Sequence, residues 1–112
     1  MKDLKISKEL IKNVLVKETE NLSDDFSFYI DEDCIVFRDE GETLFDYNIY
    51  KFAFKCKEWA RDRYNITISS ALYSNYAKSW NVDKDKSYTA KTEVEVIIKA
   101  CEWIIENLRE KI

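Results

Sequence analysis

The order of apolar and polar residues predicts three helices, each preceded by a residue that can cap its first turn. Ser7 and Asn48 are suited to accept hydrogen bonds from free backbone amides, and Thr92 with Glu95 forms a capping box. The expected helices cover residues 8–17, 49–64 and 93–109. Apolar residues recur at helical spacing within them, at Leu10, Ile11, Val14 and Leu15, at Ile49, Phe52, Ala53, Cys56, Ala60 and Tyr64, and at Val94, Ile97, Ile98, Cys101, Ile105 and Leu108.

Between these helices the apolar period changes from helical spacing to alternation, which is typical of strands. Phe26, Phe28 and Ile30 alternate with polar or amphipathic neighbours. Two short polar segments, residues 31–33 and 39–42, are expected turns, and the second of them holds Gly41, the only glycine. The expected strands are Phe26–Ile30, Cys34–Arg38 and Thr43–Phe45 in the first half, and Ile66–Leu72, Tyr76–Val82 and Ser87–Ala90 in the second, with a hairpin turn at 83–86.

This order of elements predicts a single small α+β domain over residues 1–112, with an antiparallel sheet covered by helices. The order is α-β-β-(β)-α-β-β-(β)-α, in which the bracketed strands are the shortest. A Glu-Trp pair follows a cysteine in both long helices, at Glu58-Trp59 and at Glu102-Trp103, so the pairs are 44 residues apart. The same offset places Asn48 opposite Thr92, which indicates a ββα pseudo-repeat.

Composition supports a packed core and argues against most catalytic chemistry. Hydrophobic residues make up 46% of the chain and aromatic residues 14%, whereas histidine and proline are absent. Without histidine there is no histidine-based triad or histidine metal site, and one glycine cannot form a phosphate-binding loop. The chain has enough carboxylates for a carboxylate-metal nuclease or a glycosidase. However, these acidic residues fall in predicted turns, without a sequence motif that would arrange them for catalysis. We therefore predict a non-enzymatic protein without cofactor or metal.

The cysteines and the first residues of the chain indicate the cellular compartment. Cys34, Cys56 and Cys101 are an odd number without CxxC spacing, which favours reduced and buried thiols. No apolar run reaches the roughly 18 residues of a membrane span, and the first residues alternate charged and apolar side chains instead of forming a signal peptide. We expect a cytoplasmic protein that does not enter a membrane.

Charge is distributed very unevenly along the chain. Residues 18–46 hold eleven acidic residues and only Arg38, a net charge of −10, whereas the whole chain carries −4. Carboxylates that alternate along a strand lie about 6.5–7 Å apart, so such a surface can imitate a nucleic-acid backbone. The alternative is an ordinary solubilising surface. The acidic residues predicted to bind a partner are Asp24, Asp25, Asp31, Glu32, Asp33, Asp39, Glu40 and Glu42.

Two further groups of residues are candidates for contact with partners. Tyr73, Tyr76, Trp80 and Tyr88 gather in the second hairpin region, where Tyr76 and Trp80 are predicted to anchor an interface, with Trp80 the most exposed. A role in the core or in covering the sheet is the alternative. The middle helix carries bases that could hold phosphates, but Glu58 and Asp62 interrupt them, and the pI of about 5.0 argues against direct binding of nucleic acid. The bases are Lys51, Lys55, Lys57, Arg61 and Arg63.

The strings "NIYKFAFKCKEWA", residues 48–60, and "TEVEVIIKACEWI", residues 92–104, resemble small prophage-encoded proteins of AT-rich bacteria, in which two such helices recur. The resemblance implies an accessory protein of a phage or mobile element, with no functional residue carried over. Together with the acidic segment it suggests a stoichiometric, anti-CRISPR-like inhibitor of a host defence nuclease. The expected partner is a host protein with a basic, nucleic-acid-binding groove. The alternative is a nucleic-acid-binding or self-associating accessory protein, and a homodimer stays open.

Overall fold

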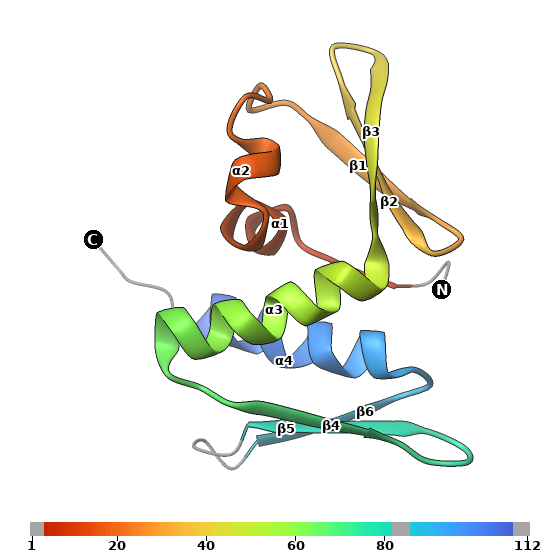
Figure 1. Ribbon diagram of the computed structural model, residues 1–112, viewed down its shortest axis with the longest axis vertical. Coiled ribbons are helices and arrows are strands. Elements are labelled where there is room, and N and C mark those ends of the chain that lie inside the picture. Colours follow the sequence, from red (N-terminus) through yellow and green to blue (C-terminus); the bar gives the residue numbers. More distant parts are fainter. Residues whose placement is uncertain (1–3, 82–85, 109–112) are drawn as a thin grey trace. The chain divides into compact units, whose positions relative to one another are not determined.

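The computed structural model describes residues 4–81 and 86–108, which form two compact units, residues 1–52 and 53–112 (Figure 1). The first unit contains two short helices and a three-stranded sheet. The second contains another three-stranded sheet and a long helix that covers it, and helix α3 (Ile49–Tyr64) begins in the first unit and continues into the second.

The first unit opens with helix α1 (Lys8–Val14) and the single-turn helix α2 (Val16–Thr19). Ser7 caps α1 as predicted, because its Oγ accepts a hydrogen bond from the backbone N–H of Leu10 at 3.0 Å. The prediction of one helix over 8–17 was wrong. Leu15 has φ −103° and ψ 57°, outside the helical region, and it ends α1 while its side chain stays fully buried.

The sheet of the first unit is an antiparallel meander in which consecutive strands pair. Its strands are β1 (Ser27–Asp31), β2 (Cys34–Asp39) and β3 (Glu42–Asn48), in the order β1-β2-β3. A bulge between Phe37 and Arg38 shifts the pairing of β2 with β3. The third strand is seven residues long and therefore longer than the predicted Thr43–Phe45.

Phe37 is the centre of the core of the first unit. Its ring stacks on Phe45 at a centroid distance of 4.7 Å and lies 6.2 Å from the rings of both Phe26 and Phe28. Phe28 and Phe45 pair with Phe37 across the strands, so the three share one face of the sheet. Phe37 is fully buried, which places the apolar face of the sheet toward the core.

The second unit has a sheet of the same topology and a helix on one of its faces. Strands β4 (Ile68–Leu72), β5 (Ala77–Asn81) and β6 (Lys86–Ala90) pair in consecutive order, and helix α4 (Glu93–Leu108) follows. The buried Ser79 Oγ donates a hydrogen bond of 2.7 Å to the carbonyl of Val96 on α4, and Lys57 Nζ of α3 lies 2.8 Å from Ser70 Oγ of β4. Both helices therefore contact the same face of the sheet, as Figure 1 also shows.

The caps of the two long helices agree with the sequence. Asn48 Oδ1 accepts hydrogen bonds from the backbone N–H groups of Tyr50 and Lys51, and Thr92 Oγ1 accepts one from Glu95. The predicted inward residues of α4 are buried, except that Leu108 is half-buried, and three more are buried with them: Val96, Ala100 and Ile104. The wider stripe indicates that α4 packs against neighbours on more than one side. The predicted last residue of this helix, Arg109, lies outside the described residues.

The α+β class and the predicted order of elements are confirmed, but the strands form two sheets instead of one. The predicted offset of 44 residues separates the starts of β3 and β6 and those of α3 and α4. Each meander is thus followed by a capped helix, as the pseudo-repeat predicts. The hairpin turn expected at 83–86 falls mainly outside the described residues, and β6 begins at its last residue, Lys86.

The prediction that all three cysteines are buried is confirmed for Cys56 and Cys101 and wrong for Cys34, which is half-buried. Cys101 Sγ lies 3.6 Å from the carbonyl oxygen of Cys56, so these two helix positions face each other. Burial, followed by the neighbouring Cys101, raises the pKa of the Cys56 thiol well above its usual value.

Replacing the two buried thiols with hydroxyls, one at a time, should destabilise the protein to different extents. Cys56→Ser should lower the free energy of unfolding by roughly 1–3 kcal/mol, because the hydroxyl enters an apolar site. Cys101→Ser should cost less, because the Cys56 carbonyl is within reach as an acceptor. Urea denaturation measures both values, and equal losses would contradict this asymmetry.

Because Cys34 is only half-buried, a thiol reagent added to the native protein should modify Cys34 before Cys56 and Cys101.

Asn81 is fully buried on β5, and neither atom of its side-chain amide has a hydrogen-bond partner among the described residues. A buried amide without partners opposes folding. We therefore expect Asn81→Leu, which has a similar volume, to raise the free energy of unfolding by about 1–2 kcal/mol. Thermal and urea denaturation measure this change. A loss of stability would instead show that the amide is satisfied by an internal water in solution.

Candidate protein-binding site

The acidic residues predicted to bind a partner lie at both ends of the sheet of the first unit. Three of them belong to the β1–β2 hairpin, where Asp31 pairs with Cys34 and Glu32 and Asp33 form the turn. A fourth carboxylate comes from Asp46 on β3, whose partner Val36 is two residues beyond Cys34 on β2. These four residues, Asp31, Glu32, Asp33 and Asp46, are called the β1–β2 acidic cluster.

The half-buried Cys34 lies beside these four carboxylates, next to Asp33 in the chain and opposite Asp31 in the sheet. Its pKa is raised by burial first, and then by the negative charges of Asp46, Asp33, Asp31 and Glu32. All four carboxylate residues are exposed to solvent, and none forms an ion pair with another described residue. The cluster is therefore a region of uncompensated negative charge centred on one half-buried thiol.

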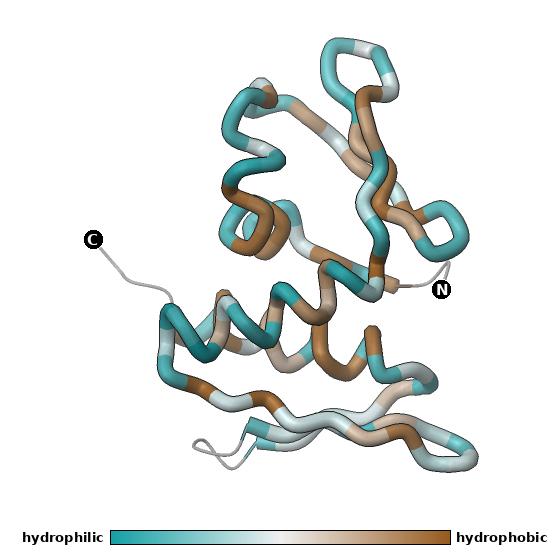
Figure 2. The backbone as a smooth tube through the Cα atoms, viewed as in Figure 1, coloured by the Kyte–Doolittle hydropathy of each residue, from teal (hydrophilic) through white to brown (hydrophobic). Residues whose placement is uncertain are grey.

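The second group of acids lies at the opposite end of the sheet. Asp39 ends β2, Glu40 lies in the β2–β3 turn, and Glu42 begins β3, while Asp24 and Asp25 lie in the loop before β1. We call these five residues the β2–β3 acidic cluster. Figure 2 shows the turns at the two ends of this sheet as hydrophilic stretches.

Within the β2–β3 acidic cluster, Asp39 is hydrogen-bonded to the loop that precedes β1. Its carboxylate accepts hydrogen bonds from the hydroxyl and from the backbone N–H of Ser23, the latter at 2.8 Å. These bonds, the side-chain bond first, lower the pKa of Asp39, and the positive charge of Lys8 lowers it further. Lys8 also donates to the carbonyl of Asp24 at 2.6 Å and lies 4.2 Å from the centre of the Phe26 ring. This end of the sheet is therefore partly compensated.

The predicted acidic site residues are consequently not one patch. Asp39 lies five residues beyond Cys34 on β2, so at about 3.3 Å per residue the two turns of the sheet are roughly 17 Å apart, although Asp46, opposite Val36, lies only about 10 Å from Asp39 along the strands. Asp39 is tied to Ser23 and is not available to a partner as the other acids are. Asp46 was missing from the predicted set. Its membership follows from the pairing of β3 with β2, which alternation alone does not reveal.

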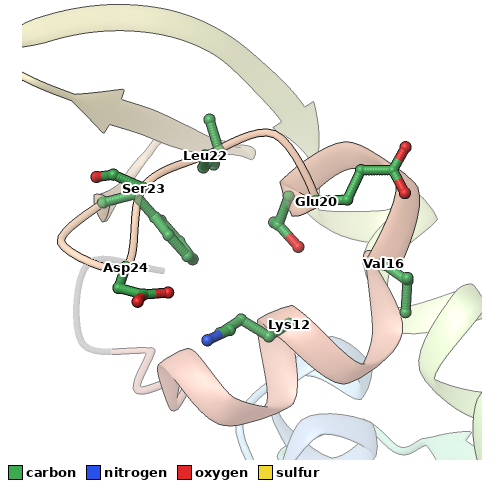
Figure 3. Close-up of a pocket in the computed structure, with 8 residues that line it drawn as sticks. Lys12, Val16, Glu20, Leu22, Ser23 and Asp24 are labelled. Carbon is green, nitrogen blue, oxygen red and sulfur yellow. The ribbon is translucent and has the colours of Figure 1, made fainter.

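A small pocket adjoins the β2–β3 acidic cluster, with a cavity volume of about 240 Å³. Lys12 and Asp24 point toward one another across it, and Phe26, Leu22 and Val16 supply apolar walls (Figure 3). The hydroxyls of Thr19 and Ser23 are already used, since they donate to Leu15 and Asp39. The volume is below the 300–1,000 Å³ typical of small-molecule sites, and it suits a single side chain of a protein partner. Its lining residues are Lys12, Val16, Thr19, Glu20, Leu22, Ser23, Asp24 and Phe26.

The predicted aromatic anchors belong to the second unit. Tyr76 is 44% exposed and stacks on Tyr73, which is 47% exposed, with ring centres 5.0 Å apart. Trp80, predicted to be the most exposed, is half-buried. Tyr88 pairs with Ser79 and so projects from the face of the sheet that α4 covers, where burial raises the pKa of its hydroxyl. Tyr88 is therefore not part of the same surface as Trp80.

At least two of the five bases of α3 already have partners within the protein. Lys57 donates to Ser70, and Arg61 forms an exposed ion pair of 3.2 Å with its neighbour Asp62. Within the described ranges, no three side chains of the metal-ligating types are close enough to hold an ion.

Comparison with known proteins adds no relative. No protein family, curated protein or solved structure matches this chain. Among the helices described here, none combines the length and the apolar character that crossing a membrane requires. The interpretation of the site therefore depends on its own residues.

The bonds between Ser23 and Asp39 make a pH-dependent contribution to stability. Because the pKa of Asp39 is lowered in the folded chain, its contribution is full above its usual value of 3.8 and is lost as the pH falls through the folded value. Asp39→Asn should therefore lower the thermal midpoint at pH 7, and the gap from the parent should close in strong acid. Asp25→Asn, an exposed neighbour, is the control. A gap that does not vary with pH would contradict the role of this carboxylate.

Proposed function

We propose that this protein is a non-enzymatic binding module of a phage or mobile element that inhibits a host defence nuclease, in an anti-CRISPR-like manner. The partner has a basic groove that normally holds nucleic acid. The β1–β2 acidic cluster occupies that groove and competes with the guide or target strand. Inhibition is stoichiometric, and it requires no cofactor or metal.

The observation that carries this proposal is the gathering of four exposed carboxylates around Cys34, none of which is in an ion pair with a described residue, although Asp33 accepts a long hydrogen bond of 3.5 Å from the Tyr50 hydroxyl. They come from one turn and from a neighbouring strand, so the backbone fixes their spacing and binding does not have to order it. Preorganised charge attracts a basic partner at a distance and raises the rate of association more than it slows dissociation. Acids scattered over a solubilising surface would lack this concentration at one end of a sheet.

The division of charge between the units supports the same assignment. Residues 1–52 contain thirteen acidic and seven basic residues, a net charge of −6, whereas residues 53–112 contain nine acidic and eleven basic residues, a net charge of +2. Because the chain's negative charge is concentrated in the first unit, a partner with a basic groove is attracted to that unit. The phage origin rests on the resemblance of the two Glu-Trp helices, and the acidic surface gives that origin a specific use.

Charge reversal at the β1–β2 acidic cluster should abolish partner capture. The variant Asp31→Lys, Glu32→Lys, Asp33→Lys, Asp46→Lys changes four exposed positions and leaves Phe37 and its neighbours in place. The parent and the variant are immobilised and exposed to lysate of a host that carries defence nucleases, and the captured proteins are identified by mass spectrometry. We expect the variant to capture at least tenfold less of a nucleic-acid-binding protein than the parent does. This corresponds to a loss of about 1.4 kcal/mol in binding free energy.

The chain offers a matched control at the other end of the same sheet. Reversal of Asp24, Asp25, Glu40 and Glu42 changes the net charge by the same amount but leaves the β1–β2 acidic cluster intact. Capture by this control should persist.

Capture by the parent should weaken as salt rises from about 0.1 M to 1 M, because the Debye length shrinks from about 10 Å to about 3 Å. Equal capture by both variants and the parent would show that the carboxylates only solubilise the protein.

A further inference from the structure

The sheet of the second unit has one face that its own helices leave uncovered. Ser79 on the central strand is fully buried and bonded to Val96 of α4, so its side chain marks the covered face. Because side chains alternate along a strand, Lys78 and Trp80 project from the other face. Figure 1 shows α3 and α4 on the same side of β4, β5 and β6. No described element of the second unit covers the face that bears Trp80.

A row of aromatic side chains follows β5 on this free face. The backbone N–H of Tyr73 donates to the carbonyl of Tyr76 at 2.7 Å, which makes these residues cross-strand neighbours just beyond the pair of Leu72 and Ala77. Ala77 is fully buried, so the two tyrosines project from the opposite, free face. Tyr76, Lys78 and Trp80 then succeed one another in steps of about 6.5–7 Å.

Among the residues that the structure describes, the free face carries positive and no negative charge. The described residues of the three strands and of the hairpin at 73–76 include no Asp or Glu, although the chain has 22 acidic residues. Lys78 stands between the aromatic rings, and the remaining side chains of this face are small and neutral. These are Ser69, Ala71, Ser87 and Thr89. A partner that complements this face is therefore anionic and carries flat, apolar rings.

We propose that the free face of β4, β5 and β6 binds single-stranded nucleic acid. Its bases stack on Trp80 and on the Tyr73–Tyr76 pair, and Lys78 contacts the phosphates between them. Base stacking on an aromatic side chain contributes about 1–3 kcal/mol per base, so the half-buried Trp80 and the two tyrosines together outweigh one lysine, and a base-bearing strand is favoured over an acidic peptide. The proposal does not rest on the proposed function, because it concerns a different unit and the opposite charge.

The pI of about 5.0 does not argue against binding of nucleic acid at this face. That value averages a first unit of net charge −6 with a second of net charge +2, and it says nothing of either surface alone. With a single lysine at the centre of the face, the electrostatic share of binding is small. The logarithm of the binding constant should therefore fall with the logarithm of the salt concentration with a slope of only about −0.7, the value for one phosphate contact to a single strand.

Fluorescence anisotropy of the full chain with labelled oligo-dT and oligo-U of about 15 nucleotides, in about 50 mM salt, tests the proposal. Both probes should bind in a saturable manner. Trp80→Ala, and separately the pair Tyr73→Ser and Tyr76→Ser, should each raise Kd at least about tenfold. The tyrosines lie at an exposed turn, so their variant keeps the test valid if Trp80→Ala does not fold, which circular dichroism will show.

Phe54→Ala supplies the matched control, because Phe54 is an aromatic residue 65% exposed on α3, the helix that contacts the covered face. This control should bind the probes as the parent does. Three results would each overturn the proposal: no binding by the parent, an equal loss in Phe54→Ala, or displacement of oligo-dT by polyglutamate of equal charge as effectively as by unlabelled oligo-dT. The last result would show that the face recognises charge alone.

Discussion

A strand presents alternate side chains to opposite faces, and both sheets bury one of those faces. In the first unit the buried face is organised by Phe37, which contacts three other rings across and beside it. In the second unit α4 covers one face and holds Ser79 by a hydrogen bond. Once these faces are buried, the side chains between them must project outward. The positions of Asp31, Asp46, Lys78 and Trp80 at the surface follow from this alternation.

Net charge describes this protein poorly because the charges are sorted by structural unit. The value of −4 is the sum of a strongly acidic first unit and a mildly basic second unit. Within the first unit the charges are sorted again, since Lys8 and Ser23 compensate the end of the sheet that holds Asp39 and no described cation pairs with the other end. Recognition depends on the field near a surface, which decays within about a Debye length, so the local sum is the relevant quantity.

The sequence predicted those features that depend on residues close together in the chain. The long helices and their caps at Asn48 and Thr92 were predicted because spacing and capping chemistry are local. The end of α1 at Leu15 was not, since that leucine is buried and continues the apolar spacing although its backbone leaves the helix. The division into two sheets, the membership of Asp46 in the acidic cluster and the partial exposure of Cys34 depend on strand pairing, which alternation does not specify.

The meander topology has a consequence for how the chain folds. Every strand pairing in the described chain joins strands that are consecutive in sequence, so each sheet closes only short loops. Local pairing of this kind is associated with fast folding, and either meander can form without waiting for the other. The chain also contains no proline, so the slow isomerisation that delays many proteins by tens of seconds does not arise. The pairing of consecutive strands and the absence of proline therefore both favour rapid folding of this chain.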